Sequence, residues 1–126
     1  MKEKIITVLL LVVALIHIAP ITGFAGVLRL ESLYGVVILD SNLQILMRHR
    51  AMLFGILGVF FAYAAFKPSL QPLAFIGAFA TLASFFYLAI SVADYNQSIS
   101  KILVADVVAS ICLLLAVVLY FTKNEG

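Results

Sequence analysis

The sequence has few charged residues and almost no cysteine. Of 126 residues, 8 are lysine or arginine, 6 are aspartate or glutamate, 1 is cysteine and none is tryptophan. The lone Cys112 excludes an intrachain disulfide and a Cys-x-x-Cys redox pair. A net charge of +2 forms no basic patch, so we expect no nucleic-acid partner. A glycine-rich phosphate loop and an acidic cluster with metal-ligand spacing are also missing, so we expect no metal site.

Apolar residues take the place of charge and make up 65% of the chain. A soluble domain is nearer half apolar and a quarter charged. A chain this short has too little interior to bury so much apolar surface. The composition therefore predicts an integral membrane protein with a single transmembrane domain over residues 1–126.

Four apolar runs are long enough to cross a bilayer, which takes roughly 20 residues of helix. We expect helices at about residues 4–21, 42–66, 70–92 and 100–121. The predicted fold class is all-α, an integral membrane antiparallel four-helix bundle. A secretory signal peptide has a similar basic start and apolar centre, but His17 and Pro20 interrupt this run, which favours a transmembrane helix.

Residues 24–39 are less regular than the predicted helices, because glycines and the charged Arg29 and Glu31 interrupt them. We expect either a short interfacial helix or an extended segment that caps the bundle. Ser41 and Gln44 have the spacing of a capping box for the second helix. Ser69 is the expected cap of the third.

Small residues at spacings of three and four mark helix faces that pack closely in a bilayer. In the second helix, Arg48 stands three residues before Ala51, the first small residue, and is expected to lie at the head of the buried stripe that these residues form. The predicted seams, which equally suit a bundle interior or a homodimer, are Ala51, Gly55, Gly58, Ala62 and Ala65; Ala74, Gly77, Thr81, Ser84 and Ser91; and Ala105, Ala109, Cys112 and Ala116.

Asp106 is the strongest candidate for a functional residue, because its carboxylate lies about one turn inside the last predicted transmembrane helix. A carboxylate in a membrane span costs about 2.5–3.5 kcal/mol, so it needs a partner or a proton. The topology places Arg48, His49 and Arg50 at the same end of the bundle. We interpret these four residues as a ligand-binding site or a structural ion pair, with either arginine as the partner of Asp106.

His17 and His49 are the only histidines, and both are expected near this end. Bis-imidazole ligation of a haem or metal is one interpretation. The simpler one is a hydrogen-bonded interior His17, an interfacial His49 and no cofactor. Arg48 and Arg50 point roughly 200° apart on a helix, so one is expected to face the bundle and the other lipid phosphate. The tyrosines Tyr34, Tyr87 and Tyr95 are predicted interface aromatics.

Several short motifs resemble a family of small uncharacterised four-helix bacterial inner-membrane proteins. These are Leu33-Tyr34-Gly35-Val36, Arg48-His49-Arg50-Ala51 followed by Leu53-Phe54-Gly55, Lys67-Pro68 with Pro72, and Val104-Ala105-Asp106. The resemblance implies a four-helix protein of the bacterial inner membrane. Some such sequences carry the label phosphopantetheine adenylyltransferase, but this chain has no phosphate loop to support that activity.

These observations favour a non-enzymatic, multi-pass protein of the cell inner (cytoplasmic) membrane. We expect it to bind a lipid-like or amphiphilic ligand, or a partner protein, with membrane lipids and a second copy of the chain as further partners. No catalytic residue is assigned. The alternatives are a membrane enzyme or redox protein that uses His17, His49 and Asp106, and a small proton-coupled transporter in which Asp106 titrates.

Overall fold

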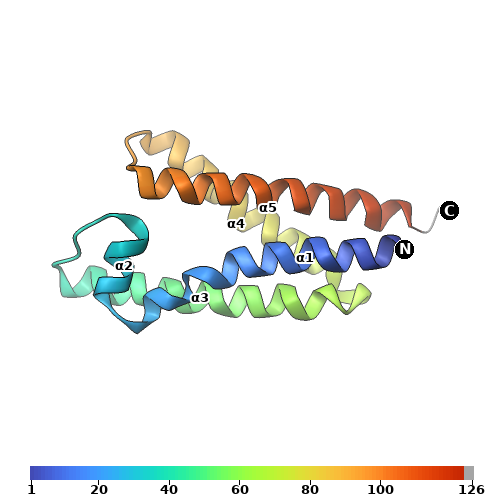
Figure 1. The fold of residues 1–126 in the computed structure, drawn as a ribbon, viewed down its shortest axis with the longest axis horizontal. Helices are drawn as coiled ribbons and strands as arrows, with labels where there is room; N and C mark the ends of the chain where they lie inside the picture. The colour runs from blue at the N-terminus through green and yellow to red at the C-terminus, as the bar shows by residue number, and fades with distance from the viewer. Residues whose placement is uncertain (124–126) are drawn as a thin grey trace.

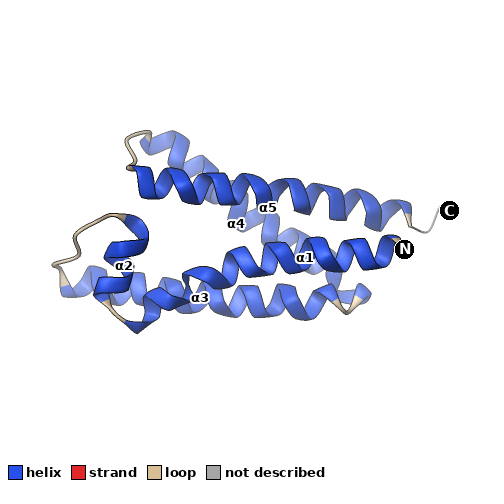
Figure 2. Cartoon of the chain, in the orientation of Figure 1, coloured by secondary structure: helices blue, strands red, loops and turns tan. Residues whose placement is uncertain are grey.

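The computed structural model describes residues 1–123 and is helical almost throughout (Figure 2); residues 124–126 of the predicted domain lie outside this range. Four stretches are long and apolar enough to cross a membrane, and each overlaps one of the four predicted helices. The all-helical prediction is confirmed. The elements are α1 (Lys2–Ile18), η1 (Ala19–Ala25), α2 (Val27–Tyr34), α3 (Ser41–Ala65), η2 (Pro68–Leu70), α4 (Gln71–Val92) and α5 (Gln97–Thr122), where η denotes a 3-10 helix.

The chain reverses direction between successive long helices, so the N-terminus and the end of α5 lie at the same end of the molecule (Figure 1). There the Nζ of Lys2 lies 3.3 Å from both the carbonyl oxygen and the hydroxyl of Thr122. Helix α1 is central, because it packs against both α3 and α5. Helix α2, at the opposite end, covers η1 and the start of α3.

The helix boundaries follow from local side-chain chemistry, with two corrections to the predicted caps. Asp40 caps α3, since its Oδ1 accepts a hydrogen bond of 2.7 Å from the backbone N–H of Asn42. Ser41 is already the first helical residue, so the predicted Ser41 cap is wrong. Ser69 lies within η2, and no side chain caps α4. Pro72 stands in the first turn of α4, as expected, because that turn needs no N–H at this position.

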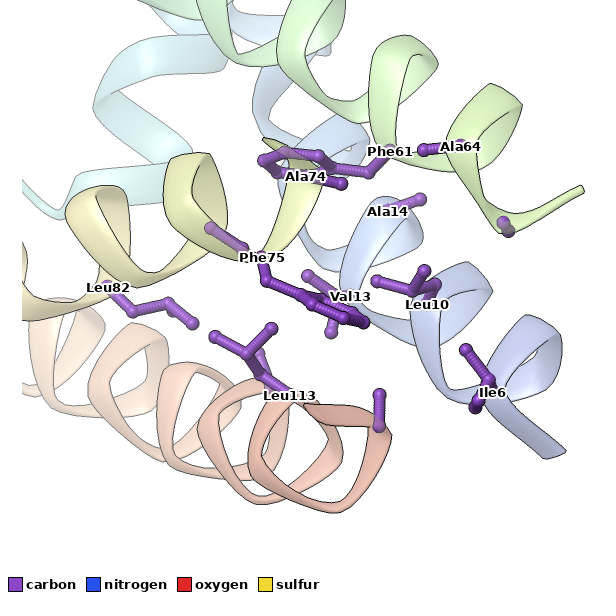
Figure 3. Packing of buried hydrophobic residues seen from close by; sticks show 14 residues of the cluster. Ile6, Leu10, Val13, Ala14, Phe61, Ala64, Ala74, Phe75, Leu82 and Leu113 are labelled. Atoms are coloured by element: carbon purple, nitrogen blue, oxygen red, sulfur yellow. The ribbon is translucent and has the colours of Figure 1, made fainter. Parts of the chain in front are cut away.

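The main hydrophobic core lies between α1, α3, α4 and α5 (Figure 3). Helix α1 contributes one continuous face to it, with side chains spaced three and four residues apart. The labelled core residues in Figure 3 are Ile6, Leu10, Val13, Ala14, Phe61, Ala64, Ala74, Phe75, Leu82 and Leu113.

Two glycines of α3 allow its backbone to approach the α1–η1 segment closely, Gly58 against α1 and Gly55 against η1. A Cβ atom at Gly58 would lie 2.9 Å from both the carbonyl oxygen of Ala14 and the backbone nitrogen of Ile18. A Cβ atom at Gly55 would overlap the side chain of Ile21. Both glycines are buried, as the small-residue pattern of this helix predicts. We call this contact the α1–α3 seam.

The small-residue pattern fails in the second half of α4. Ser84 and Ser91 are exposed, so the predicted seam ends near Thr81. Each serine instead donates to a carbonyl oxygen of its own helix, that of Thr81 and that of Tyr87 respectively. Such local bonds satisfy a hydroxyl without a neighbouring helix. The tertiary contacts of α4 are therefore concentrated in its first half.

Candidate functional site: a polar-edged cavity where the helices meet

A partly open cavity of about 220 Å³ lies where α2 and the four long helices converge, and every one of them contributes to its wall. Most of the wall is apolar. The apolar lining residues are Ile16, Ala19, Pro20, Leu33, Phe54, Leu82, Phe85, Ile102 and Ala105. The polar lining residues are His17, Tyr34, Arg50, Thr81 and Asp106.

Arg50 is held in a fixed position on the cavity wall. Its Nη1 donates a hydrogen bond of 2.7 Å to the hydroxyl of Tyr34. Its guanidinium carbon lies 4.6 Å from the ring centroid of Phe54 and 5.3 Å from that of Tyr34. Phe54 is one helical turn further along α3 and so occupies the same face. A guanidinium has five N–H donors, so Arg50 retains donors for a ligand.

Tyr34 is fixed in turn by the start of α5. It ends α2 and is only 5% exposed, so the prediction of an interface aromatic is wrong for this residue. Gly35 follows it with a φ of +65°, a left-handed conformation that suits glycine and ends the helix. The Nδ2 of Asn96 donates to the carbonyl oxygens of Tyr34 and Gly35, at 2.8 and 3.0 Å. Its Oδ1 meanwhile caps α5 by accepting from the N–H of Ile99 at 2.9 Å.

His17 is 3% exposed, and both of its ring nitrogens have protein partners. Nδ1 lies 2.9 Å from the carbonyl oxygen of Val13 and must donate to it. Nε2 lies 2.8 Å from the hydroxyl of Thr81, so the ring joins α1 to α4. The single proton of the Thr81 hydroxyl is shared between two acceptors, Nε2 of the neutral ring and the carbonyl oxygen of Ala78, which lies 2.9 Å away. Its ring also packs edge-on against Phe61, with centroids 4.9 Å apart.

Asp106 reaches the cavity from α5 and is half-buried. Within residues 1–123, no hydrogen bond reaches its carboxylate, and no ion pair within 4.0 Å joins it to Arg50. The structure therefore brings two opposite charges to one cavity without pairing them. A carboxylate accepts hydrogen bonds and a guanidinium donates them, so the two walls present complementary functions to a bound molecule.

Arg48 and His49 lie outside the lining of this cavity. The Nε of Arg48 donates to the carbonyl oxygen of Phe24 at 2.9 Å, and its guanidinium carbon is 5.5 Å from the Phe24 ring. Arg48 lies at the start of the small-residue face of α3 that packs on η1, and it is half-buried there. His49 is exposed. The two arginines serve different sides of α3: Arg50 lines the cavity and Arg48 contacts Phe24 of η1, while contact of an arginine with lipid phosphate stays a prediction.

The donor atoms at the cavity do not form a metal cluster. Residues 1–123 contain no group of three or more histidine, cysteine, aspartate and glutamate side chains that fits a metal ion. Of the two histidines proposed as ligands, only His17 lines the cavity, and both of its ring nitrogens are hydrogen-bonded. Ligation of a haem or metal by His17 and His49 stays a prediction.

Comparisons with protein-family models, with curated proteins and with solved structures find no match to this chain. The resemblance to small bacterial inner-membrane proteins therefore stays a prediction.

Sequence reasoning missed the aromatic support of the site. Tyr34 lies in the segment that was hardest to assign, and Phe54 looks like any other apolar residue of α3. The available signal was the spacing of four residues from Arg50 to Phe54, which places a cation beside a ring on one helix face. No local pattern indicates that Tyr34 folds back onto the same arginine.

Proposed function

We propose that the protein is a multi-pass protein of the inner (cytoplasmic) membrane, built as an antiparallel four-helix bundle, that holds an amphiphilic ligand in the cavity. The four apolar spans and their exposed surface of large apolar side chains support membrane insertion. The resemblance of short motifs in the chain to bacterial inner-membrane proteins supports the choice of membrane.

The observation that carries the proposal is that Arg50 and Asp106 line the cavity without forming an ion pair. Both line one largely apolar cavity, yet they are not paired with each other. Charged groups within a membrane span are costly and are retained at functional sites or in ion pairs. A ligand with an apolar body and a polar end satisfies both parts of the wall, so Arg50 and Asp106 are the proposed anchors.

Native mass spectrometry of the protein, extracted gently from its own membrane, tests this proposal. We expect a retained molecule of defined mass in the parent protein and its loss in Arg50→Gln. Arg48→Gln is the matched control, because it removes the same charge two residues away and outside the cavity. Equal retention by both variants, or a bare parent chain, contradicts the proposal. The same spectra give the oligomeric state and so test the homodimer.

A proton-handling site is the second candidate, and one observation favours it. His17 and Asp106, two of the three residues proposed as acid and base, line the same cavity. A proton-coupled transporter requires that Asp106 exchanges its proton during the cycle. Proton uptake by reconstituted vesicles that is unchanged in Asp106→Asn contradicts this candidate.

A further inference from the structure

We propose that the ligand is phosphatidylethanolamine, with its phosphate at Arg50 and its ammonium at Asp106. This inference rests on the proposed function and names the class of amphiphile. The argument uses the charges on the cavity wall, the size of the cavity and the aromatic groups that surround Arg50.

The charges on the cavity wall match a zwitterion. Arg50 donates one hydrogen bond to Tyr34 and keeps further N–H groups for an anion. The Tyr34 hydroxyl accepts from Arg50, so its own proton is also available to an anion. Asp106 offers only acceptors, which fit an ammonium donor. A purely anionic headgroup would satisfy Arg50 and face the carboxylate of Asp106 with a like charge.

The aromatic groups discriminate between ammonium types. A quaternary ammonium has no N–H donor and is recognised by the open faces of aromatic rings. Here the rings of Phe54 and Tyr34 already have the Arg50 guanidinium over them, at 4.6 and 5.3 Å, which leaves the single phenyl ring of Phe85 in place of an aromatic cage. The Asp106 carboxylate is the group that is left to bind the cation of the ligand, and a primary ammonium binds a carboxylate with charge-assisted hydrogen bonds. The site therefore suits ethanolamine better than choline.

The size of the cavity fits a headgroup and not a whole lipid. An apolar cavity of about 150 Å³ holds benzene, so the 220 Å³ cavity has room for about eight or nine non-hydrogen atoms. A phosphoethanolamine group has about eight. The acyl chains must then leave through the open side of the cavity and lie against the exposed apolar side chains that the long helices carry.

The test uses the full chain in nanodiscs with equal parts of phosphatidylethanolamine, phosphatidylcholine and phosphatidylglycerol. Native mass spectrometry after release reports which lipid stays bound. We expect phosphatidylethanolamine to be retained at least about tenfold over the other two, since a hydrogen bond to a charged group discriminates by that much. Asp106→Asn should abolish the preference over phosphatidylglycerol. Arg50→Gln should abolish retention, and Arg48→Gln should change nothing.

The outcomes separate this inference from the proposed function. Equal retention of phosphatidylcholine, or a preference unchanged in Asp106→Asn, overturns the ethanolamine inference. Retention of another amphiphile that depends on Arg50 overturns it too, but leaves the proposed function standing. The absence of any Arg50-dependent retention overturns both. Free glycerophosphoethanolamine, added to the released protein at the same concentration as the lipid, should not displace the lipid, and displacement identifies a soluble ligand instead. Each variant is first checked for the elution volume and helical content of the parent.

Discussion

The α1–α3 seam and the cavity show two opposite uses of the same membrane-type sequence. At the seam, Gly55 and Gly58 leave no room for a Cβ atom of their own, because Ile21 lies against Gly55, and Ile18 and the Ala14 backbone lie against Gly58. At the cavity, the helices stand apart and the space is edged by charged and aromatic groups. Near these glycines the contact is made by aliphatic side chains and backbone, and the hydrogen bond from the Thr7 hydroxyl to the carbonyl oxygen of Ala65 lies further along the helices. The cavity instead has two charged side chains that form no ion pair within residues 1–123.

This difference suggests that the seam determines the stability of the fold and that the cavity determines which ligand is bound. In the bilayer that we propose for this protein, close packing is the main source of helix association, so the seam should dominate the free energy of unfolding. The cavity contributes less packing and carries the groups that select a ligand. Substitutions at the seam should therefore change folding first, and substitutions at the cavity wall should change binding first.

The largest effect is expected from Gly58→Ala. The added methyl group would lie 2.9 Å from backbone atoms of Ala14 and Ile18, which cannot rotate away. Overpacking of this kind costs about 1–3 kcal/mol. Thermal unfolding in detergent, followed by circular dichroism, measures the loss.

Gly77→Ala is the matched control for this change. A Cβ atom there would lie 3.5 Å from the ring of Phe61, an ordinary van der Waals contact. Its unfolding free energy should stay within about 1 kcal/mol of the parent, because alanine also favours the helix. Equal losses in both variants would show that the α1–α3 seam is not the tighter contact.

The seam could be predicted from sequence because its signal is local. Small residues at fixed spacing define a helix face whatever the partner is, and Ala51, Gly55 and Gly58 are all buried. The same rule failed for Ser84 and Ser91, because serine is both small and able to bond its own helix. Spacing alone does not tell whether a neighbouring helix reaches that part of α4.

The next effect in size is expected at the bond between His17 and Thr81. Thr81→Val keeps the shape of the side chain and removes the hydroxyl that lies 2.8 Å from Nε2. The ring nitrogen then has no partner in a buried site, which costs about 1–2 kcal/mol. Thermal unfolding reports this loss. Ser84→Ala, on the exposed face of α4, removes a hydroxyl bonded only within its helix and should have no measurable effect. A Thr81→Val protein as stable as Ser84→Ala would argue against a tie between α1 and α4.

The cavity was harder to predict because its contacts join residues far apart in sequence. Asp106 and an inward arginine followed from the cost of charge in a membrane and from helix geometry. The contacts of the two arginines depend on the path of η1 and α2, since Tyr34 of α2 binds Arg50 and the carbonyl oxygen of Phe24 in η1 binds Arg48. No periodicity in residues 24–39 specifies that path.

A smaller and more local effect is expected at Asn96, which supports the cavity from behind Tyr34. Asn96→Ser keeps an oxygen that caps α5 and removes the N–H donors to Tyr34 and Gly35. Global stability should change little, while amide hydrogen exchange in α2 should become faster. Asn96→Ala removes the cap as well and should cost about 1 kcal/mol more. Unchanged exchange in α2 for both variants would show that Asn96 does not hold this segment.

The smallest effect is expected at the far end, where Lys2 meets Thr122. The contact is exposed and its two distances are 3.3 Å. The conformational entropy that the Lys2 side chain loses therefore nearly cancels the free energy that the contact contributes. Lys2→Met should leave the midpoint of thermal unfolding unchanged. The two ends of the chain come together because four long helices reverse direction three times, and this path does not need a bond between them. A clear fall in the midpoint would show instead that this end is held by its polar contact, and that the packing of α1 against α5 is weaker than its apolar core suggests.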